Sequence, residues 1–281
     1  MTDQGRPEIG NQVDVGGIAT NYLEVGSGAP LLLVHGSGPG VTAYANWRLT
    51  IGDLARHFRV LAPDMAGFGH SDKPTADGYS MKGWVDQLVG FLDALGIERA
   101  SLVGNSFGGG LGIRLAVEHP GRLDRLVLMG SMGVSFPITE GLDQVWGYQP
   151  SFENMRKVLD YFAYSRELVN DELAEVRYHA ALAPGVQEAF SAMFPAPRQR
   201  WVEAMSTPED QIRAIQQETL IIHGRDDQVI PLSNAYRLLG LIERAELHVF
   251  GRCGHWSQIE WAAEFNALLI RFLTRKARPE E

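Results

Sequence analysis

Hydrophobic residues occur along the chain in two kinds of run, and together they predict a sheet whose strands alternate with helices. Short runs rich in Leu, Val and Ile end at Gly, Pro or Asp, as buried strands do, and cover residues 31–35, 59–63, 100–103, 126–129, 219–223 and 246–250. Stretches with apolar residues every three or four positions, such as 84–95 and 265–272, predict amphipathic helices. This alternation is typical of a largely parallel sheet covered by helices.

The beginning of the chain predicts a different local structure. Residues 13–25 alternate in polarity around Gly16-Gly17. A two-residue glycine turn between alternating segments predicts an antiparallel hairpin leading into the sheet.

The segment 135–208 also departs from the alternation. It holds no convincing buried-strand run, is rich in aromatic residues, Met and Pro, and shows helical patterns at 152–164 and 171–182. A helical segment inserted between two strands is a natural lid over the strand ends. We therefore expect an α/β core made of residues 1–134 and 209–281, and a helical cap made of residues 135–208.

Composition and charge narrow the class of protein. The chain has 281 residues, 45% hydrophobic and 21% charged, which is ordinary for a soluble globular protein. The net charge of −9 argues against nucleic acid or an anionic membrane as a partner. With one cysteine, no apolar signal-peptide core and no run long enough to span a bilayer, we expect a cytoplasmic protein.

The strongest chemical signal is a serine in a glycine-rich turn. Gly104-Asn105-Ser106-Phe107-Gly108 matches G-x-S-x-G and lies between the strand at 100–103 and a helical run at 111–118. Such a turn lifts the serine oxygen out of the chain in a strained conformation, while the small residues let neighbouring backbone approach. We interpret Ser106 as a nucleophile; the alternative is a glycine-rich turn needed only for packing.

A serine nucleophile needs a base, and after a turn of this kind the order along the chain is serine, acid, histidine. His255 lies in the loop 251–256 after the last predicted strand, where a mobile catalytic imidazole belongs. The other histidines after Ser106 have different expected places. His119 lies at a helix end and His179 in the cap, while His223 and His248 lie in strand runs and are expected in the core. We predict that His255 is the base.

Asp227 is the preferred acid. It follows a predicted buried strand in Gly224-Arg225-Asp226-Asp227, where the Gly-x-x-Asp spacing turns the chain before the carboxylate. The neighbouring Asp226 is expected to be a solvated turn residue, with Arg225 as its candidate partner. Cys253 is a weaker candidate nucleophile because no helix N-terminus lies beside it, and we expect it to be a packing residue.

An oxyanion hole requires backbone N–H groups aimed at the reacting carbonyl. The N–H of Phe107, directly after the nucleophile, is one candidate. The others lie in the glycine-rich loop His35-Gly36-Ser37-Gly38-Pro39-Gly40, after the first buried strand, so Gly36, Ser37 and Gly38 are the candidates there. A phosphate-binding role for this loop is weakly supported, since it contains neither G-x-x-x-x-G-K-[ST] nor a complete G-x-G-x-x-G.

Over nearly its whole length the chain resembles the α/β-hydrolases, and more narrowly the meta-cleavage product hydrolases, which cleave carbon–carbon bonds in aromatic catabolism. The segments that carry the resemblance are HGSGPG at 35–40, APDMAGFGHSD at 62–72, GNSFGGG at 104–110, VSFPITEGLDQVWGY at 134–148, FPAPRQRW at 194–201, LIIHGRDDQVIPL at 220–232 and HVFGRCGHW at 248–256. The cap is similar to that of 2-hydroxymuconate semialdehyde hydrolase and its alkyl-substituted relatives.

The resemblance implies an activity and a set of site residues. Such enzymes hydrolyse 2-hydroxy-6-oxo-2,4-dienoates to 2-hydroxypenta-2,4-dienoate and a carboxylic acid, with water and without a cofactor or metal. It implies that Ser106, Asp227 and His255 form a catalytic triad and that Arg177 binds the carboxylate and dienol end of the substrate. The remaining implied contacts are Asn46 and Asn105 to polar substrate oxygens and Trp256 beside the dienoate. It also implies a homo-oligomer, at least a dimer.

Arg177 has a physical argument of its own. An anionic substrate entering a protein of charge −9 needs a local cation, and a guanidinium binds a carboxylate through paired hydrogen bonds. The alternative is a cap-surface arginine paired with Glu175 or Glu172. Arg198 and Arg200 are rival cations that we expect at the surface or between core and cap.

Two other functions remain compatible with the same motifs. A carboxylesterase or lactonase would use the same triad and differ only in the cap and at Arg177. A ligand receptor would keep the triad with negligible turnover. Substituent preference (hydrogen, methyl, small branched alkyl or phenyl) is expected to depend on pocket volume shaped by cap residues such as Ile138, Trp146 and Phe194.

Overall fold

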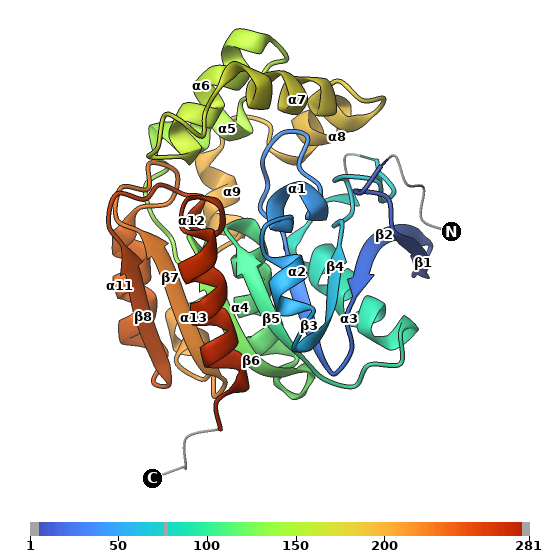
Figure 1. Ribbon diagram of the computed structural model, residues 1–281, viewed down its shortest axis with the longest axis vertical. Helices are drawn as coiled ribbons and strands as arrows, with labels where there is room; N and C mark the ends of the chain where they lie inside the picture. The colour runs from blue at the N-terminus through green and yellow to red at the C-terminus, as the bar shows by residue number, and fades with distance from the viewer. Residues whose placement is uncertain (1–5, 76–77, 277–281) are drawn as a thin grey trace.

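An eight-stranded sheet runs through the middle of the protein in the computed structural model, which describes residues 6–75 and 78–276 (Figure 1). The strands follow the order β1-β2-β4-β3-β5-β6-β7-β8. β2 pairs antiparallel with β1 and β4, and all the other pairs are parallel. The strands are β1 (Asn11–Val15), β2 (Ile18–Val25), β3 (Ala29–Val34), β4 (Phe58–Pro63), β5 (Ala100–Asn105), β6 (Leu123–Met129), β7 (Glu218–Gly224) and β8 (Ala245–Phe250). The predicted α/β architecture and the N-terminal hairpin are confirmed.

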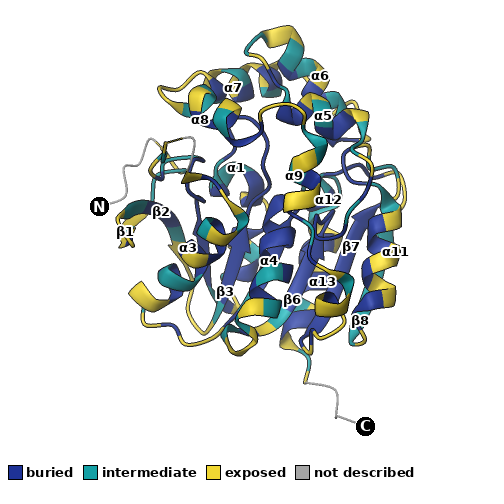
Figure 2. Ribbon diagram, turned by 180° about the vertical axis from the view of Figure 1, so that it is seen from behind, coloured by how far each residue is buried: buried dark blue, intermediate teal, exposed yellow. Residues whose placement is uncertain are grey.

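The sheet is buried on both faces because its parallel strands are hydrophobic at successive positions. Leu32 and Val34 of β3 belong to one apolar cluster, and their neighbours Leu31 and Leu33 belong to another on the opposite face. Successive strand residues point to opposite faces, so an unbroken apolar run serves two layers at once. Figure 2 shows the central strands buried and the outward faces of the helices exposed.

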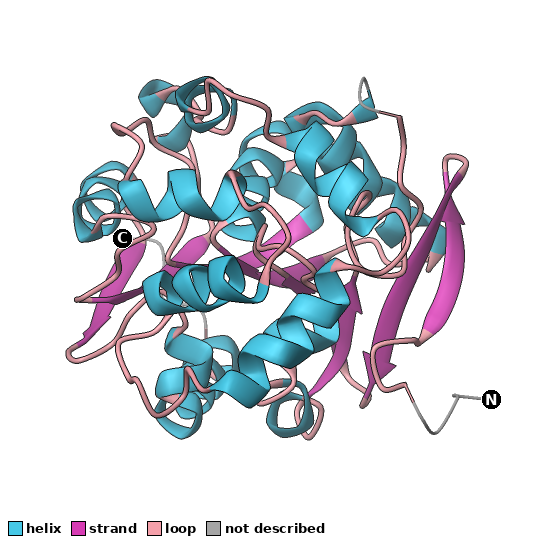
Figure 3. Ribbon diagram, turned by 90° about the horizontal axis from the view of Figure 1, so that it is seen from above, coloured by secondary structure: helices cyan, strands magenta, loops and turns pink. Residues whose placement is uncertain are grey.

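Helices cover each face of the sheet, as Figure 3 shows from above. Buried side chains of α3 (Met81–Ala94), α4 (Phe107–Glu118) and α11 (Leu232–Leu241) join the Leu32 cluster. Those of α1 (Ala43–Trp47), α2 (Ile51–Leu54) and α13 (Ala262–Thr274) join the Leu31 cluster. Short elements complete this part of the chain: η2 (Pro120–Arg122), α10 (Glu209–Ile212) and α12 (Ser257–Glu260). Over the described ranges, no helix is long and apolar enough to cross a membrane.

A group of helices between β6 and β7 lies above one end of the sheet (Figure 1). They are α5 (Glu140–Trp146), α6 (Phe152–Phe162), α7 (Asp171–Ala181), α8 (Val186–Met193) and α9 (Gln199–Ala204). Buried residues of α5 and α6, such as Leu142 and Leu159, belong to the same apolar cluster as Leu32. This packing holds the helices against the end of the sheet at which Ser106 lies.

Candidate active site

Ser106 lies at the sharp turn between β5 and α4. It is the N-cap of α4 and has φ 54° and ψ −110°, a conformation that strains a residue with a Cβ. The turn is tight because of its glycines: a Cβ on Gly104 would lie 2.3 Å from the carbonyl oxygen of Gly108. A Cβ on Gly108 would lie 2.3 Å from the carbonyl oxygen of Val34. The structure therefore has the strained turn predicted from G-x-S-x-G.

Asp227 and His255 meet although they are far apart in sequence. Nδ1 of His255 lies 2.7 Å from Oδ2 of Asp227, and both side chains are buried. Oδ1 of Asp227 accepts the backbone N–H groups of Val229 (2.8 Å) and Ile230 (3.0 Å), which fixes the carboxylate plane. Donation from Nδ1–H leaves Nε2 of His255 as the proton acceptor of the ring.

His223 is a second imidazole beside the acid and was expected only to be a core residue. It is buried, and its Nε2 lies 2.9 Å from the carbonyl oxygen of Ile230 and 3.4 Å from Oδ2 of Asp227. Burial by itself raises the pKa of Asp227, but His255 and His223 outweigh it and hold that pKa well below its usual range. Asp227 is therefore ionised wherever the protein is folded near neutral pH.

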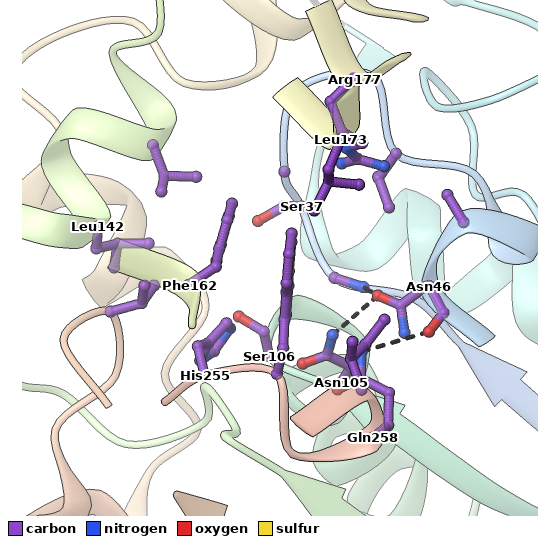
Figure 4. Close-up of a pocket in the computed structure, with 18 of the residues that line it drawn as sticks. Ser37, Asn46, Asn105, Ser106, Leu142, Phe162, Leu173, Arg177, His255 and Gln258 are labelled. Atoms are coloured by element: carbon purple, nitrogen blue, oxygen red, sulfur yellow. Dashed lines mark hydrogen bonds between the residues drawn. The ribbon is translucent and has the colours of Figure 1, made fainter. Parts of the chain in front are cut away.

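Ser106 and His255 face the same pocket, which has about 590 Å³ of free space including its mouth (Figure 4). In Figure 4 the Ser106 hydroxyl lies beside the His255 ring, with Leu142 and Phe162 on one side and Asn46 on the other. Outside α5 to α7, the other residues that line the pocket are Gly36, Ser37, Gly38, Val41, Ala45, Asn46, Arg48, Asn105, Val229, Trp256, Gln258 and Ile259. Side chains from α5, α6 and α7 close it from above.

Arg177 reaches this pocket from α7. It lies on the buried face of that helix with Ala174 and Ala181, and it is only 8% exposed. Its Nη2 donates to the carbonyl oxygen of Pro39 (3.1 Å), and its buried Nε has no hydrogen-bond partner in the described part of the chain. Within residues 6–75 and 78–276 no carboxylate forms an ion pair with it, so the alternative pairing with Glu175 or Glu172 is wrong.

The surroundings of Arg177 destabilise its charged form. Burial, together with the positive charge of Arg48, lowers the pKa of Arg177 to about 10. The guanidinium remains protonated at neutral pH, and it is a buried cation whose hydrogen-bonding capacity is only partly used. Such a group is stabilised when an anion binds beside it.

Asn46 and Asn105 form a pair at the base of the pocket. Oδ1 of Asn46 accepts from Nδ2 of Asn105 (2.8 Å) and from the backbone N–H of Gly36 (3.2 Å). Among the residues that the structure describes, Nδ2 of Asn46 and Oδ1 of Asn105 are buried without a hydrogen-bond partner, so a donor and an acceptor remain available.

The candidate oxyanion donors differ in availability. The N–H of Gly36 is taken by Asn46, so Gly36 is not a free donor. Phe107 opens α4, and the first N–H groups of a helix have no acceptor within it. Ser37 and Gly38 line the same pocket, which leaves them and Phe107 as the candidates that fit.

The wall above Ser106 differs from the expected one. It consists of Leu142, Val145, Phe162 and Leu173, and it does not include Ile138, Trp146 or Phe194. Trp146 and Phe194 stack on each other with ring centroids 4.6 Å apart, behind the lining, because large flat rings fill the interior between packed helices. Trp256 does line the pocket and stacks on Phe162 with centroids 4.8 Å apart.

The remaining candidates lie outside the pocket. Arg198 pairs with Asp143, and Arg200 lies over the ring of Trp201. Cys253 is fully buried, and burial raises the pKa of its thiol to about 12, as suits a packing residue.

The other histidines are placed as follows. His119 is the C-cap residue of α4, and His179 is exposed, with its Nε2 3.9 Å from Oε1 of Glu175. His248 is only half-buried, because β8 is an edge strand, so its expected place in the core is wrong.

Comparison with known proteins now identifies the family. Residues 29–262 match the alpha/beta hydrolase fold family. The chain is 60% identical to 2-hydroxymuconate semialdehyde hydrolase of Pseudomonas sp. (strain CF600), over 96% of this chain and 95% of that protein. The identity is also 60% to 2-hydroxy-6-oxo-2,4-heptadienoate hydrolase of Pseudomonas putida, over 95% and 96%. The crystal structure of the meta-cleavage product hydrolase CumD from Pseudomonas fluorescens IP01 superposes with a TM-score of 0.94 at 57% identity, covering 95% of this chain and 98% of that one.

The chain belongs to the meta-cleavage product hydrolases of the α/β-hydrolase fold. The resemblance inferred from HGSGPG, GNSFGGG and the 134–148 segment is thus confirmed for family and fold. In the described part of this hydrolase, no group of three or more His, Cys, Asp or Glu side chains is placed to hold a metal ion.

Proposed function

We propose that this hydrolase cleaves the C5–C6 bond of 2-hydroxy-6-oxo-2,4-dienoates, with a hydrogen or a small alkyl group on the distal carbonyl. The names of its 60% identical relatives support this substrate class. The observation that carries the proposal is the buried Arg177 guanidinium, which has no carboxylate partner among the described residues, in the pocket that Ser106 and His255 share. An esterase acting on neutral esters has no use for a cation held at that energetic cost.

In this proposal Ser106, Asp227 and His255 act as a triad. His255 removes a proton through Nε2, and Asp227 holds the ring and stabilises its charged form. The N–H of Phe107 and those of Ser37 or Gly38 stabilise the oxyanion. The cap is assigned to residues 135–208, over a core of residues 1–134 and 209–281.

Arg177 and the asparagine pair orient the substrate. The carboxylate and the 2-oxygen bind Arg177, with Asn46 and Asn105 supplying the remaining hydrogen bonds. The planar dienoate lies against Trp256. The distal carbonyl then lies at Ser106, and its substituent points toward Leu142 and Val145. These two residues line the same pocket as Ser106.

The chemistry first requires that the leaving carbon can hold electrons. A proton leaves the 2-hydroxyl and a proton is added at C5, which converts the dienol to its keto form. Oγ of Ser106, or a water molecule that Ser106 positions, then attacks C6 as His255 takes the proton of the nucleophile. The C5–C6 bond breaks, its electron pair delocalises into the 2-oxo group, and reprotonation gives 2-hydroxypenta-2,4-dienoate. If Ser106 is the nucleophile, one water molecule then hydrolyses the acyl-enzyme to the carboxylic acid; if water is the nucleophile, the cleavage itself releases the acid.

We further propose a cytoplasmic homo-oligomer, at least a dimer, that works without a cofactor or metal. Bacterial catabolic relatives and the absence of a membrane-spanning helix from residues 6–75 and 78–276 are compatible with that location. The acidic charge of −9 disfavours nucleic acid and membrane surfaces as partners.

The test is turnover of 2-hydroxymuconate semialdehyde and of its methyl and phenyl ketone analogues, followed by loss of the yellow dienolate absorbance. Wild type should bleach the colour quickly, and Ser106→Ala should abolish turnover while still binding the dienolate. Product analysis should give 2-hydroxypenta-2,4-dienoate and the matching acid.

Simple aryl esters and lactones serve as competing substrates. Stable colour together with brisk ester or lactone cleavage would establish the esterase or lactonase alternative instead. No turnover of any of these substrates would favour a ligand receptor.

A further inference from the structure

The loop that carries His255 is fastened to the proposed cap rather than to the core alone. The carbonyl oxygen of Phe162, the last residue of α6, accepts the backbone N–H groups of His255 (2.7 Å) and Trp256 (3.1 Å). The Phe162 ring also stacks against His255, with centroids 5.8 Å apart. The main chain of the proposed base is therefore held by a residue of α6.

Glu260 adds a second connection between the same two segments. Its Oε2 accepts the backbone N–H groups of Tyr164 and Ser165, each at 2.9 Å, just after α6. Its Oε1 accepts the N–H of Gly254 at 2.7 Å, directly before His255. One carboxylate thus joins the cap to the catalytic loop through backbone donors on its two oxygens.

The chemistry of this connection demands a carboxylate. An ionised carboxylate is an acceptor only, so it can satisfy N–H groups on both of its oxygens at once. An amide in its place would turn an NH2 group toward one set of these donors. The segments also touch closely, because a Cβ on Gly254 would lie 2.7 Å from the Phe162 carbonyl oxygen. The loop that carries His255 therefore has little room to adjust if the Glu260 connection is lost.

Glu260 lies outside the substrate pocket. It ends α12 and is absent from the residues that line the cavity containing Ser106. Burial raises the pKa of Glu260, although its backbone donors oppose the shift. This glutamate is partly withdrawn from solvent, and its three N–H partners compensate its charge.

We propose that Glu260 is a positioning residue that couples the cap to His255, so that the placement of the cap sets the placement of the catalytic base. The proposal rests on the proposed function of Ser106, Asp227 and His255. It assigns no substrate contact to Glu260. A displacement of the base by about 1 Å is enough to lower a rate by about 10²-fold.

The test compares Glu260→Gln, which removes the charge at constant shape, with Glu260→Asp, which keeps a carboxylate on a shorter side chain. Glu264→Gln is the matched control, because Glu264 is an exposed glutamate on the next helix. Readouts are kcat and KM for the dienoate, the dissociation constant of the dienoate in a Ser106→Ala background, and the rate at which an alkyl fluorophosphonate labels Ser106. The labelling rate depends on base activation of the serine but on no particular substrate.

The expected result is a fall of about 10- to 100-fold in kcat and in the labelling rate for Glu260→Gln. KM and the dissociation constant should stay within about twofold, Glu260→Asp should retain intermediate rates, and Glu264→Gln should match wild type. As the pH falls, protonation of Glu260 should lower the labelling rate of wild type. Glu260→Gln should lack this part of the decline.

Folded Glu260→Gln with wild-type labelling and kcat overturns the proposal. So does an increase in the dissociation constant that matches the fall in kcat, which indicates a generally loosened pocket. If Glu260→Gln does not fold, Glu260→Asp with wild-type rates overturns it equally. Failure of wild type to hydrolyse dienoates contradicts the proposed function alone, because labelling still tests Glu260; failure of wild type to be labelled contradicts both.

Discussion

The indole Nε1 of Trp146 donates a hydrogen bond to Oγ of Ser37 over 3.0 Å, joining α5 to the loop that supplies the candidate oxyanion donors. Both residues are buried. Trp146 does not line the pocket, but its hydrogen bond connects it to Ser37, which does. The wall above the active site and the oxyanion loop are therefore one connected structure.

Replacing Trp146 with Phe should lower kcat by about two- to tenfold, because one neutral hydrogen bond contributes about 0.5–1.5 kcal/mol. The stacking on Phe194 is kept, so KM should change little, whereas the lost hydrogen bond and the smaller buried ring should lower the melting temperature. Trp201→Phe is the control, since it removes an indole hydrogen bond to Pro195 away from the loop. Steady-state kinetics of Trp146→Phe and Trp201→Phe checks the prediction, and an equal fall in kcat for the two variants would contradict it.

Replacing Arg177 with Met should stabilise the protein while disabling it. The substitution removes a buried charge that has no carboxylate partner in the described structure, so the free energy of unfolding should rise by about 1 kcal/mol or more. Loss of the charged hydrogen bonds to the substrate should lower kcat/KM by about 10- to 100-fold. Urea unfolding and dienoate kinetics measure these effects. Arg198→Met, which breaks the pair with Asp143, should give no stabilisation.

Replacing Asp227 with Asn should lower kcat by about 10⁴-fold, the size that the corresponding change has in a Ser-His-Asp triad. An amide facing Nδ1 of His255 favours the wrong tautomer of the ring. Asp226→Asn removes a carboxylate that contacts Arg225 and the N–H of Cys253, and it should cost less than tenfold. Turnover assays on the two variants decide between the adjacent aspartates, and a reversed order would reassign the acid.

The lowered pKa of Asp227 also predicts how stability depends on pH. A carboxylate whose pKa is lower in the folded state contributes stability above its unfolded pKa of about 3.9, and this is lost as pH falls below that value. The difference in unfolding free energy between wild type and Asp227→Asn should therefore shift against wild type as the pH falls from about 5 to about 2. Urea titrations at several pH values measure it; a constant difference would mean that the Asp227 pKa is ordinary.

Enlarging the pocket at Val145 should change which ketone is preferred. Val145 lines the pocket beside Leu142, on the side of Ser106 where the distal substituent lies in the proposed binding mode. Val145→Ala should raise kcat/KM for the phenyl ketone relative to the methyl ketone by about tenfold, since a methylene is worth about 1–3 kcal/mol of discrimination. Val176→Ala, an exposed change on α7, is the control. An unchanged ratio would place the distal group elsewhere.

Much of the fold was predictable because its determinants are local. Apolar runs such as Leu31–Val34 can be buried on two faces only as strands of a covered sheet, and β3 and its parallel neighbours formed where those runs lie. The turn at Ser106 follows from the glycines on either side of it, which alone permit the close backbone contacts found there.

The contact between Asp227 and His255 was predictable for a related reason. Parallel strands end at one edge of the sheet, so loops after successive strands meet there, and Asp227 and His255 each follow such a strand. The expected order of serine, acid and histidine along the chain then left few candidates for the acid and the base.

The wall of the pocket and its supports were decided by tertiary packing alone. The packing of α5 to α7 on the sheet decides which of their residues face Ser106. It places Leu142 and Val145 in the pocket lining and Trp146 behind that lining. The Glu260 connection joins Tyr164 to a residue 96 positions later, and no local pattern encodes such a pair. The sequence by itself determined the strands, the turn and the loop positions, because these depend on near neighbours; only the folded chain decided which distant groups share hydrogen bonds, because that depends on how the layers pack.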